Sequence, residues 1–378
     1  VAARSLQEEM VRAEPVEPPR GTGKDTVLLT GATGFLGAFI LRALMREACP
    51  LRCARVVCIV RADDGAAASA RLRTCMEGYG LTFDEQRVEA VAGDLESERL
   101  GLTKAAFLAL AGRLRCVIHC GARVSSAIPY AALRESNVGG TRRALALALV
   151  ASADFVHVST MGFLPLGHAE SRVVADGGLA AQTGYAQSKW VSEQLVSYAA
   201  QHMQCRARIV RPGVVCGDSS TGAANLKDAT SMLLCGLVTE GVTCTEPRSP
   251  VPRLFNLCPC DTVAEATVSI AAMPWERHQA EFRGAAFHLC ASESVTLELL
   301  CDWLRGAGHE LREVAAQTFC ARIRGIDEGH PLFPLKAMLS TPAPAAVAAD
   351  AAQATSFDTT LRDQALGGVS SCWTIQRE

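Results

Sequence analysis

The sequence predicts an α/β protein built on a doubly wound parallel sheet. Short apolar runs, typical of buried strands, alternate with longer helical segments. The first run, at 26–30, leads through a glycine-rich turn into a helical segment at 38–45, and a second run follows at 55–60, the distance expected of a βαβ unit. Glycines and polar residues stand where the runs end, and this is the edge at which such sheets bind ligands.

The alternation continues along the chain. Further strand-like runs are expected at 88–92, 116–119, 154–159 and 206–210. Helical segments lie between them, notably at 130–151 and 185–202. Parallel strands joined by helices bring the carboxyl ends of neighbouring strands to one edge, so we expect the functional site there.

Composition limits the classes of protein to which the chain can belong. It has 378 residues, more than one typical domain, and 49% are hydrophobic, as in globular proteins. A net charge of −2 gives no reason to expect binding to nucleic acid. The sequence indicates neither a membrane span nor a signal peptide, so we expect a soluble, cytoplasmic protein. The 16 cysteines lack the spacing of a zinc site or a disulfide framework, so we expect no bound metal.

The turn after the first strand has the spacing Gly-x-x-Gly-x-x-Gly, formed by Gly31, Gly34 and Gly37. Gly31 permits a tight turn, Gly34 lets the backbone approach a pyrophosphate at the helix N-terminus, and Gly37 allows the helix to pack closely on the strand. A plain structural turn is the alternative. If the turn binds a dinucleotide, the candidate contacts are Gly31, Thr33, Gly34, Phe35, Leu36 and Gly37.

The residue after the second strand bears on the choice of cofactor. NAD-binding chains usually place an acid there to hold the ribose 2′-hydroxyl, whereas this chain has Arg61. A guanidinium suits a 2′-phosphate and favours NADPH, and Arg71 supplies a second cation unless it is an ordinary solvated arginine. Asp63 and Asp64 follow closely and weaken this preference.

The ends of the next strands carry further candidates. Asp94, followed by Leu95, closes the third strand and could accept a hydrogen bond from an adenine amino group. After the fourth strand, small residues such as Ala122 leave room for a cofactor. Ser159 and Thr160 end the fifth strand. One of these hydroxyls can bond a substrate carbonyl oxygen as negative charge develops on it, but strand alternation lets only one face the site.

Tyr185 and Lys189 stand four residues apart, so a helix places them on one face. The ammonium of Lys189 would stabilise phenolate, lower the tyrosine pKa and make Tyr185 a usable acid near neutral pH. An ordinary exposed helix start is the alternative. Pro212 and Gly213 end the sixth strand and turn the chain over the nicotinamide end of the site.

Together these motifs resemble the extended short-chain dehydrogenase/reductase superfamily over residues 26–324. The chain is most similar to the thioester reductase domains that end some nonribosomal peptide and polyketide synthases and that occur in carboxylic acid reductases and aminoadipate reductase. The segments that carry this similarity are Val60-Arg-Ala62 with Ala70-Arg-Leu72, His119-x-x-Ala-x-Val124 with Pro129-Tyr130, Asn137-Val-x-Gly-Thr141, Arg211-Pro-Gly-x-Val-x-Gly-Asp218, Thr221-Gly222, Pro259-x-Asp261 and Val295-Thr-Leu-x-x-Leu-x-x-Trp303.

The resemblance implies an NADPH-dependent enzyme that reduces an acyl or peptidyl thioester on the phosphopantetheine of a carrier protein to an aldehyde, with reduction onward to the alcohol left open. The family's catalytic threonine, tyrosine and lysine correspond to Thr160, Tyr185 and Lys189, which decides between Ser159 and Thr160. The further cofactor contacts that it implies are Asn137, Lys189 and Val215. Two positions on the substrate side, Ser125 and Cys260, depart from the family's usual residues, so the acyl group is not predicted.

The chain should divide into a Rossmann-type domain and a smaller, mostly C-terminal substrate-binding subdomain. The resemblance also implies that a carrier domain precedes it in a larger multidomain chain. The expected regions are a linker at 1–25, the NADP-binding domain at 26–221 with 258–290 returning to it, the substrate-binding subdomain at 222–257 and 291–340, and an Ala/Pro-rich linker and tail at 341–378 with a short helix near 359–366.

Carrier proteins are typically acidic, so arginines are expected at the site entrance. The candidates are Arg248, Arg253, Arg322 and Arg324. Other functions fit parts of the pattern. A fatty acyl-CoA reductase performs the same chemistry on a soluble thioester but often carries membrane-associating segments. Arg61 argues against an NAD-dependent sugar epimerase or dehydratase, and Tyr185 argues against a binding domain without redox activity.

Overall fold

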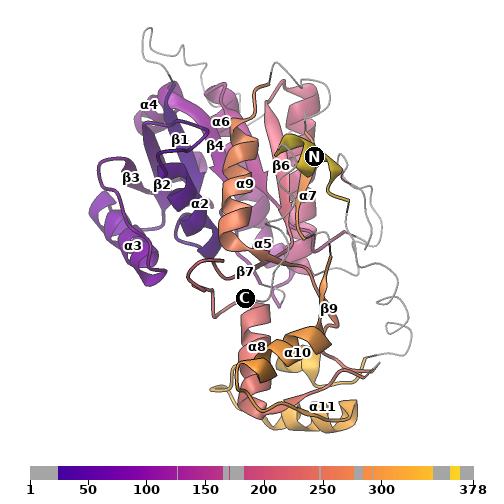
Figure 1. The fold of residues 1–378 in the computed structure, drawn as a ribbon. Helices are drawn as coiled ribbons and strands as arrows, with labels where there is room; N and C mark the ends of the chain where they lie inside the picture. Colours follow the sequence, from indigo (N-terminus) through magenta and orange to yellow (C-terminus); the bar gives the residue numbers. More distant parts are fainter. Residues whose placement is uncertain are drawn as a thin grey trace.

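A seven-stranded parallel sheet with helices on both faces forms the larger part of the protein, and a smaller, mainly helical region lies at one end of it (Figure 1). The computed structural model describes residues 24–125, 127–164, 170, 183–246, 248–275, 284–291, 293–343 and 358–366. The linker expected at 1–25 lies almost wholly outside these residues, and so does much of the tail expected at 341–378.

The strands of the sheet follow the order β11-β6-β5-β4-β1-β2-β3, and every neighbouring pair is parallel. The order reverses between β1 and β4, which is the point where doubly wound sheets open a crevice for ligands. The six strands predicted from the sequence are confirmed, with small shifts at their ends, and their bounds are Thr26–Thr30 (β1), Arg55–Val60 (β2), Val88–Ala92 (β3), Leu114–His119 (β4), Asp154–Val158 (β5) and Ala207–Pro212 (β6). The seventh strand, Ala286–Leu289 (β11), was not predicted.

Alternate strand residues face opposite sides of the sheet and enter two separate cores. Val27 and Leu29 pack with α2, α3 and α9 on one side, whereas Leu28 packs with α4, α6 and α7 on the other. All three side chains are fully buried, which explains why the strand is a continuous apolar run. These helices are α2 (Phe35–Met45), α3 (Gly65–Gly78), α4 (Lys104–Arg113), α6 (Gly140–Val150), α7 (Gly184–His202) and α9 (Cys260–Ala272).

A third core occupies the smaller region. Leu233 and Leu237 of α8 pack there with Phe319 of α11, and Leu332 fills the space beside Gly236, where a Cβ would lie 2.1 Å from the Leu332 Cγ. The core lies in the region predicted as the substrate-binding subdomain, and its role with substrate stays a prediction. The elements here are α8 (Ala229–Glu240), α10 (Leu297–Gly306), α11 (Ala316–Gly325), a 3₁₀ turn (Phe333–Leu335) and α12 (Lys336–Leu339).

Three short strand pairs lie outside the seven-stranded sheet. Two-residue strands pair within the smaller region, and a parallel pair follows the end of β6. The pairs are β7 (Val214–Cys216) with β10 (Leu257–Pro259), β8 (Val242–Thr243) with β13 (Arg312–Glu313), and β9 (Leu254–Phe255) with β12 (Val295–Thr296). The short helix expected near 359–366 is α14 (Thr360–Ala365), which packs against β11.

The helical segment predicted at 130–151 is confirmed, but a π-helical turn, which the sequence did not indicate, interrupts it. The structure has α5 (Tyr130–Arg134), a π-helical turn (Glu135–Gly139) and then α6. Polar side chains compete for the backbone at this turn, because the Asn137 carbonyl accepts hydrogen bonds from the hydroxyls of Thr141 at 2.7 Å and Ser192 at 3.3 Å. Apolar periodicity does not reveal such a turn, and π-helical turns are frequent near functional sites.

In the described part of the chain, no helix combines the length and the apolar character needed to cross a membrane. The described cysteines are free thiols, and most of them are buried.

Gly37 tests the close packing of α2 on the first strand. A Cβ at Gly37 would lie 2.0 Å from the Gly31 carbonyl oxygen, which is backbone and cannot move aside. Gly37→Ala should therefore lower the free energy of unfolding by about 1–3 kcal/mol. Gly78, also helical, has nothing within 4 Å of the added Cβ, so Gly78→Ala should be neutral or slightly stabilising. Urea denaturation of both variants makes the comparison, and equal effects would contradict it.

Candidate active site

The glycine turn joins β1 to α2 at the point where the strand order reverses. Gly31 has a φ of +77°, and a Cβ there would lie 2.6 Å from the Cα of Gly121, which follows β4. The Gly34 N–H donates to the Gly31 carbonyl at 2.9 Å and closes the turn, and α2 begins at Phe35. The side-chain-free surface of Gly31 thus lets the ends of β1 and β4 meet.

The first turn of α2 presents backbone N–H groups at this edge of the sheet. No acidic side chain stands in that turn, so an anion at the helix N-terminus meets no carboxylate there. Phe35 packs its ring on Phe39 and Tyr79, with centroid distances of 5.4 and 5.3 Å. The Thr33 carbonyl accepts from the Cys75 thiol at 3.2 Å, which ties the turn to α3. The turn fits a pyrophosphate, with Leu36 and Gly37 following Phe35 in the first turn.

The two predicted arginines lie together at the end of β2. Arg61 is exposed, and Arg71 donates from Nη1 to the Arg61 carbonyl at 2.7 Å, so α3 brings the second guanidinium back to this strand end. The Asp64 carboxylate caps α3 by accepting from the Ala67 N–H at 2.8 Å. That hydrogen bond gives Asp64 a structural role and weakens the argument that it holds a ribose.

The end of β3 approaches the glycine turn from the other side. The Asp94 carboxylate accepts from the Glu96 N–H at 2.9 Å, which fixes a local turn. A Cβ on Gly121 would lie 2.7 Å from a Leu95 methyl, and one on Gly140 would lie 3.0 Å from the Leu95 Cβ. Leu95 therefore packs on two glycines, beside the partly buried Ala122.

Helix α7 carries the Tyr-x-x-x-Lys pair. The Thr183 hydroxyl caps it by accepting from the Ala186 N–H at 3.2 Å. Gly184 allows close packing, because a Cβ there would lie 2.4 Å from the Tyr130 backbone nitrogen. Lys189 is only 3% exposed, and its Nζ donates to the Val158 carbonyl at 2.6 Å. Helix α7 is thereby joined to the last residue of β5, two residues before Thr160.

Burial controls the protonation of both members of the pair. It lowers the pKa of Lys189 to about 8, and it raises the pKa of Tyr185 above its ordinary value, with the nearby Cys120 thiol adding to the rise. The expected lowering of the tyrosine pKa is therefore wrong for this structure, because burial dominates and the ammonium is directed at the Val158 carbonyl. A raised pKa keeps the phenol protonated, which is the state that a proton donor needs.

The two adjacent hydroxyls have different surroundings. Thr160 is partly exposed, and its Oγ1 accepts from the Gly162 N–H at 3.1 Å, which leaves its own proton free to donate. Ser159 is 4% exposed, and its hydroxyl has no hydrogen-bond partner among the described residues. This contrast favours Thr160 as the hydroxyl that faces a ligand.

Asn137 joins three segments of the site. Its Oδ1 accepts from the Arg123 N–H at 2.7 Å, and its Nδ2 donates to the Arg123 carbonyl at 3.1 Å and to the Ser188 hydroxyl at 2.9 Å. The Ser188 hydroxyl donates in turn to the Tyr185 carbonyl at 2.7 Å. The side-chain amide of Asn137, a predicted cofactor contact, thus holds the loop after β4 against α7.

The chain after β6 passes over the ends of β5 and β11. The Pro212 carbonyl accepts from the Met161 N–H at 3.0 Å, and the Gly213 N–H donates to the Leu289 carbonyl at 3.0 Å. A Cβ on Gly213 would lie 2.6 Å from the Asn256 Oδ1. Val215 follows in β7, partly buried.

Several buried polar residues of this region were missed by sequence analysis. His119 bridges the hydroxyls of Thr30 at 2.8 Å and Thr141 at 3.1 Å, and burial lowers its pKa to about 3, so it is neutral. Glu193, four residues beyond Lys189, forms a fully buried ion pair with Arg211 at 2.7 Å. Glu193 follows Lys189 by four residues, the same spacing that separates Tyr185 from Lys189. This spacing could have indicated that Glu193 lies near the pair.

One cluster of possible metal ligands exists within the described residues, formed by Asp218, Cys260 and Asp261. The two carboxylates already accept hydrogen bonds from Arg42, from Ser219 to Thr221 and from the backbone of that turn. These hydrogen bonds give the two carboxylates a structural role, which is to hold the turn after β7 in place.

Comparisons with known proteins agree with this architecture. Residues 29–267 match the family described as Male sterility protein. The crystal structure of the terminal R domain from the myxalamid PKS-NRPS biosynthetic pathway is similar with a TM-score of 0.80 and 30% identity, covering 100% of this chain and 95% of that one.

Curated relatives include two fungal reductases. Glycine betaine reductase ATRR of Emericella nidulans is 36% identical over 76% of this chain, and the L-2-aminoadipate reductase large subunit of Penicillium chrysogenum is 37% identical over 67%. The chain spans only 22% and 19%, respectively, of the length of these proteins.

The lowered pKa of Lys189 predicts how stability depends on pH. Since the folded pKa of about 8 lies below the ordinary lysine pKa of 10.5, the folded state binds fewer protons between these values, and the protein should gain stability as pH rises through this window. Relative to Lys189→Met, the gain should approach about 3 kcal/mol. Denaturant unfolding at several pH values measures it, and a pH-independent difference between the two proteins would contradict the assignment.

Proposed function

The chain belongs to the male sterility protein family of NAD-binding reductases, and on this premise we propose that it reduces a carrier-bound acyl or peptidyl thioester to an aldehyde with NADPH. The chain is an oxidoreductase of the extended short-chain type, with a nicotinamide cofactor. The phosphate form of the cofactor, the thioester substrate and the carrier partner are the proposed parts.

The observation that carries the proposal is the contact between Lys189 and the Val158 carbonyl at 2.6 Å. It holds the helix with Tyr185 against the strand that ends two residues before Thr160. The contact supports the proposed roles of Tyr185 as proton donor and Thr160 as oxyanion hydroxyl, because it holds their segments together at the carboxyl edge of the sheet. This is the arrangement that reduction of a carbonyl requires.

When bound, the nicotinamide supplies a hydride to the carbonyl carbon of the thioester. Thr160 donates a hydrogen bond to the carbonyl oxygen as negative charge develops there, since its own acceptor site is filled by the Gly162 N–H. Tyr185 then gives its proton to that oxygen. Collapse of the hemithioacetal breaks the carbon–sulfur bond and releases an aldehyde and a thiol. Lys189 holds the ribose and the tyrosine in place.

The preference for NADPH rests on the end of β2. Arg61 is exposed where an acid would hold a ribose diol, and Arg71 is held next to it by its bond to the Arg61 carbonyl. Two guanidiniums offer charge-assisted, bidentate hydrogen bonds to a 2′-phosphate. Asp64, an acid three residues after Arg61, does not offset this preference, because its carboxylate caps α3.

The proposed partner is an acidic carrier protein. Of the arginines considered for its recognition, Arg253 pairs with Glu298 at 3.1 Å and Arg322 approaches Glu240 at 3.7 Å. Arg324 donates to the Ser340 carbonyl at 2.7 Å. Arg248 is exposed. Such surface charges act mainly on the association rate and weaken with salt, so we assign them steering and not tight binding.

The direct test presents one acyl group on its carrier protein and on free pantetheine, with NADPH, and identifies the product. The account expects an aldehyde or alcohol from both, and a higher kcat/KM for the carrier that declines as salt rises. If kcat/KM is equal for both at every ionic strength, the carrier is not recognised and a coenzyme A thioester is the better substrate. If neither is reduced, the proposed function is wrong.

Substitutions at the catalytic residues separate their roles. Tyr185→Phe keeps the ring and removes the proton, so kcat should fall by roughly 10²–10⁴. Thr160→Val should lower kcat through the lost oxyanion contact, while Ser159→Ala should have a smaller effect because that hydroxyl is buried. Steady-state kinetics decides, and full activity in Thr160→Val together with loss in Ser159→Ala would reverse the assignment.

The cofactor preference has its own test. Arg61→Ala should weaken NADPH binding by on the order of 1.5–3 kcal/mol, the contribution of a charge-assisted hydrogen bond, and leave NADH binding nearly unchanged. Fluorescence titration with both cofactors measures this, with Arg52→Ala as the control for loss of an exposed arginine near β2. Equal affinities for NADPH and NADH in the parent protein would refute the preference.

A further inference from the structure

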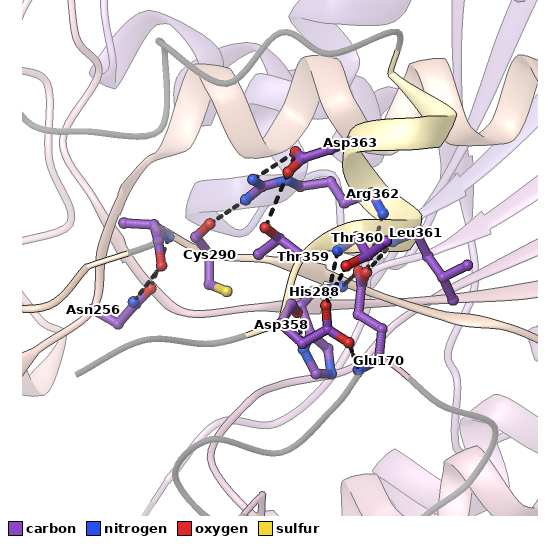
Figure 2. A network of polar contacts seen from close by, with 11 residues as sticks. Glu170, Asn256, His288, Cys290, Asp358, Thr359, Thr360, Leu361, Arg362 and Asp363 are labelled. Atoms are coloured by element: carbon purple, nitrogen blue, oxygen red, sulfur yellow. Dashed lines mark hydrogen bonds and ion pairs between the residues drawn. The ribbon is translucent and has the colours of Figure 1, made fainter. Parts of the chain in front are cut away.

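The C-terminal segment 358–366 is fastened to the edge strand β11 through one carboxylate, that of Glu170 (Figure 2). Glu170 Oε1 accepts from the His288 N–H at 2.6 Å, and Oε2 accepts from the N–H groups of Leu361 at 2.5 Å and Arg362 at 3.2 Å. The Glu170 N–H donates to the Asp358 carboxylate at 3.0 Å. Three hydrogen bonds thus join Glu170, which lies between Thr160 and Tyr185 in the sequence, to segment 358–366, and a fourth joins it to β11.

Two further contacts complete the attachment. The His288 Nδ1 lies 2.9 Å from the Asp358 carbonyl, and Arg362 donates from Nη1 to the Cys290 carbonyl (Figure 2). Arg362 is 1% exposed and Glu170 is 9% exposed. Hydrogen bonds among groups so well shielded from water are expensive to break, because each group would be left buried without its partner.

The same histidine leads to the catalytic helix. His288 Nε2 lies 3.3 Å from the Arg211 Nη1, and Arg211 binds Glu193 through Nε at 2.9 Å and Nη2 at 2.7 Å. A guanidinium only donates, so Nε2 of His288 accepts and Nδ1 carries the proton that is given to the Asp358 carbonyl. A directed chain of hydrogen bonds therefore runs from α7 through β6 and β11 to the C-terminal segment.

Arg211 lies between the segment that follows Thr160 and the helix that carries Lys189. Its guanidinium lies over the ring of Phe163, 5.8 Å from the centroid, and Phe163 follows Thr160 by three residues. Glu193 follows Lys189 by one helical turn on the face that also carries Tyr185. Neither Arg211 nor Glu193 is exposed, so a shift of the guanidinium would leave a charge buried and unpaired.

We propose that the C-terminal segment 358–366 is a positioning element for catalysis, and that Glu170 and His288 transmit its hold to Arg211 and the catalytic helix. The inference rests on the proposed reduction, because its purpose is to keep Tyr185 and Lys189 aligned with Thr160. The role proposed for Glu170 is indirect, because its described hydrogen bonds go to β11 and to segment 358–366. Glu170 is a positioning residue that connects an end of the chain, remote in sequence, to the helix of the proton donor.

The test compares three variants of the full chain. Glu170→Ala removes all three acceptor contacts, and Glu170→Gln keeps the size of the side chain and one acceptor oxygen. Glu265→Ala is the matched control, since it deletes an exposed carboxylate that pairs with Arg46 on the surface. Burial raises the pKa of Glu170 to about 7, so all assays are made near pH 8, where the carboxylate is ionised.

Two readouts are needed. Glu170→Ala should lower kcat for thioester reduction by about 10- to 100-fold, the usual cost of a misplaced catalytic group, with the Kd for NADPH nearly unchanged. It should also speed amide hydrogen exchange in the first two turns of α7. Glu170→Gln should fall between Glu170→Ala and the parent in both, and Glu265→Ala should match the parent.

The second readout does not depend on the reaction. If the parent reduces no thioester, the proposed function fails, and hydrogen exchange of α7 still decides whether the segment holds the helix. If exchange rises only in 358–366, or if kcat is unchanged while α7 loosens, the segment is not a positioning element. Where Glu170→Ala does not yield folded protein, Glu170→Gln decides by the same criteria.

Discussion

One buried hydrogen bond, from the Lys189 ammonium to the Val158 carbonyl, fixes the position of α7, which carries Tyr185, relative to β5, the strand that ends two residues before Thr160. Burying a cation is unfavourable, and the pKa of about 8 reflects this cost. The ammonium donates a hydrogen bond to the carbonyl at the end of β5, and the nearby Cys120 and Glu193 raise the pKa of Lys189 against the effect of burial. The positions of Tyr185 and Lys189 therefore depend on the end of the sheet being intact.

The sheet edge in turn depends on close approaches that only glycine permits. Gly31 meets Gly121 across the reversal of strand order, and Gly184 lets α7 contact the backbone at Tyr130. At each position an added Cβ would strike backbone and not a flexible side chain. Backbone packing thus brings the glycine turn and α7 to the same edge of the sheet, and the hydrogen bond from Asn137 to Ser188 and the ion pair of Glu193 with Arg211 fix α7 to the neighbouring segments.

The sequence was sufficient for the features that have a strong local pattern. Buried strands appear as apolar runs, and the spacing of Tyr185 and Lys189 follows from helix geometry, so both could be predicted. The π-helical turn at Asn137 could not, because it arises from side chains that compete for backbone groups. The direction of the Tyr185 pKa shift was mispredicted because burial, which raises this pKa, depends on tertiary packing. Likewise, nothing in the sequence indicated that Glu170 joins Asp358, 188 residues away.

The central claim is that a hydride reaches a thioester carbonyl at the site formed by Thr160, Tyr185 and Lys189. Single-turnover reduction with NADPH deuterated at C4 of the nicotinamide tests it most directly. The account predicts that one of the two C4 positions delivers deuterium to C1 of the released aldehyde, and that Tyr185→Phe slows this transfer. An acyl product without deuterium, or transfer at an unchanged rate in Tyr185→Phe, would contradict it.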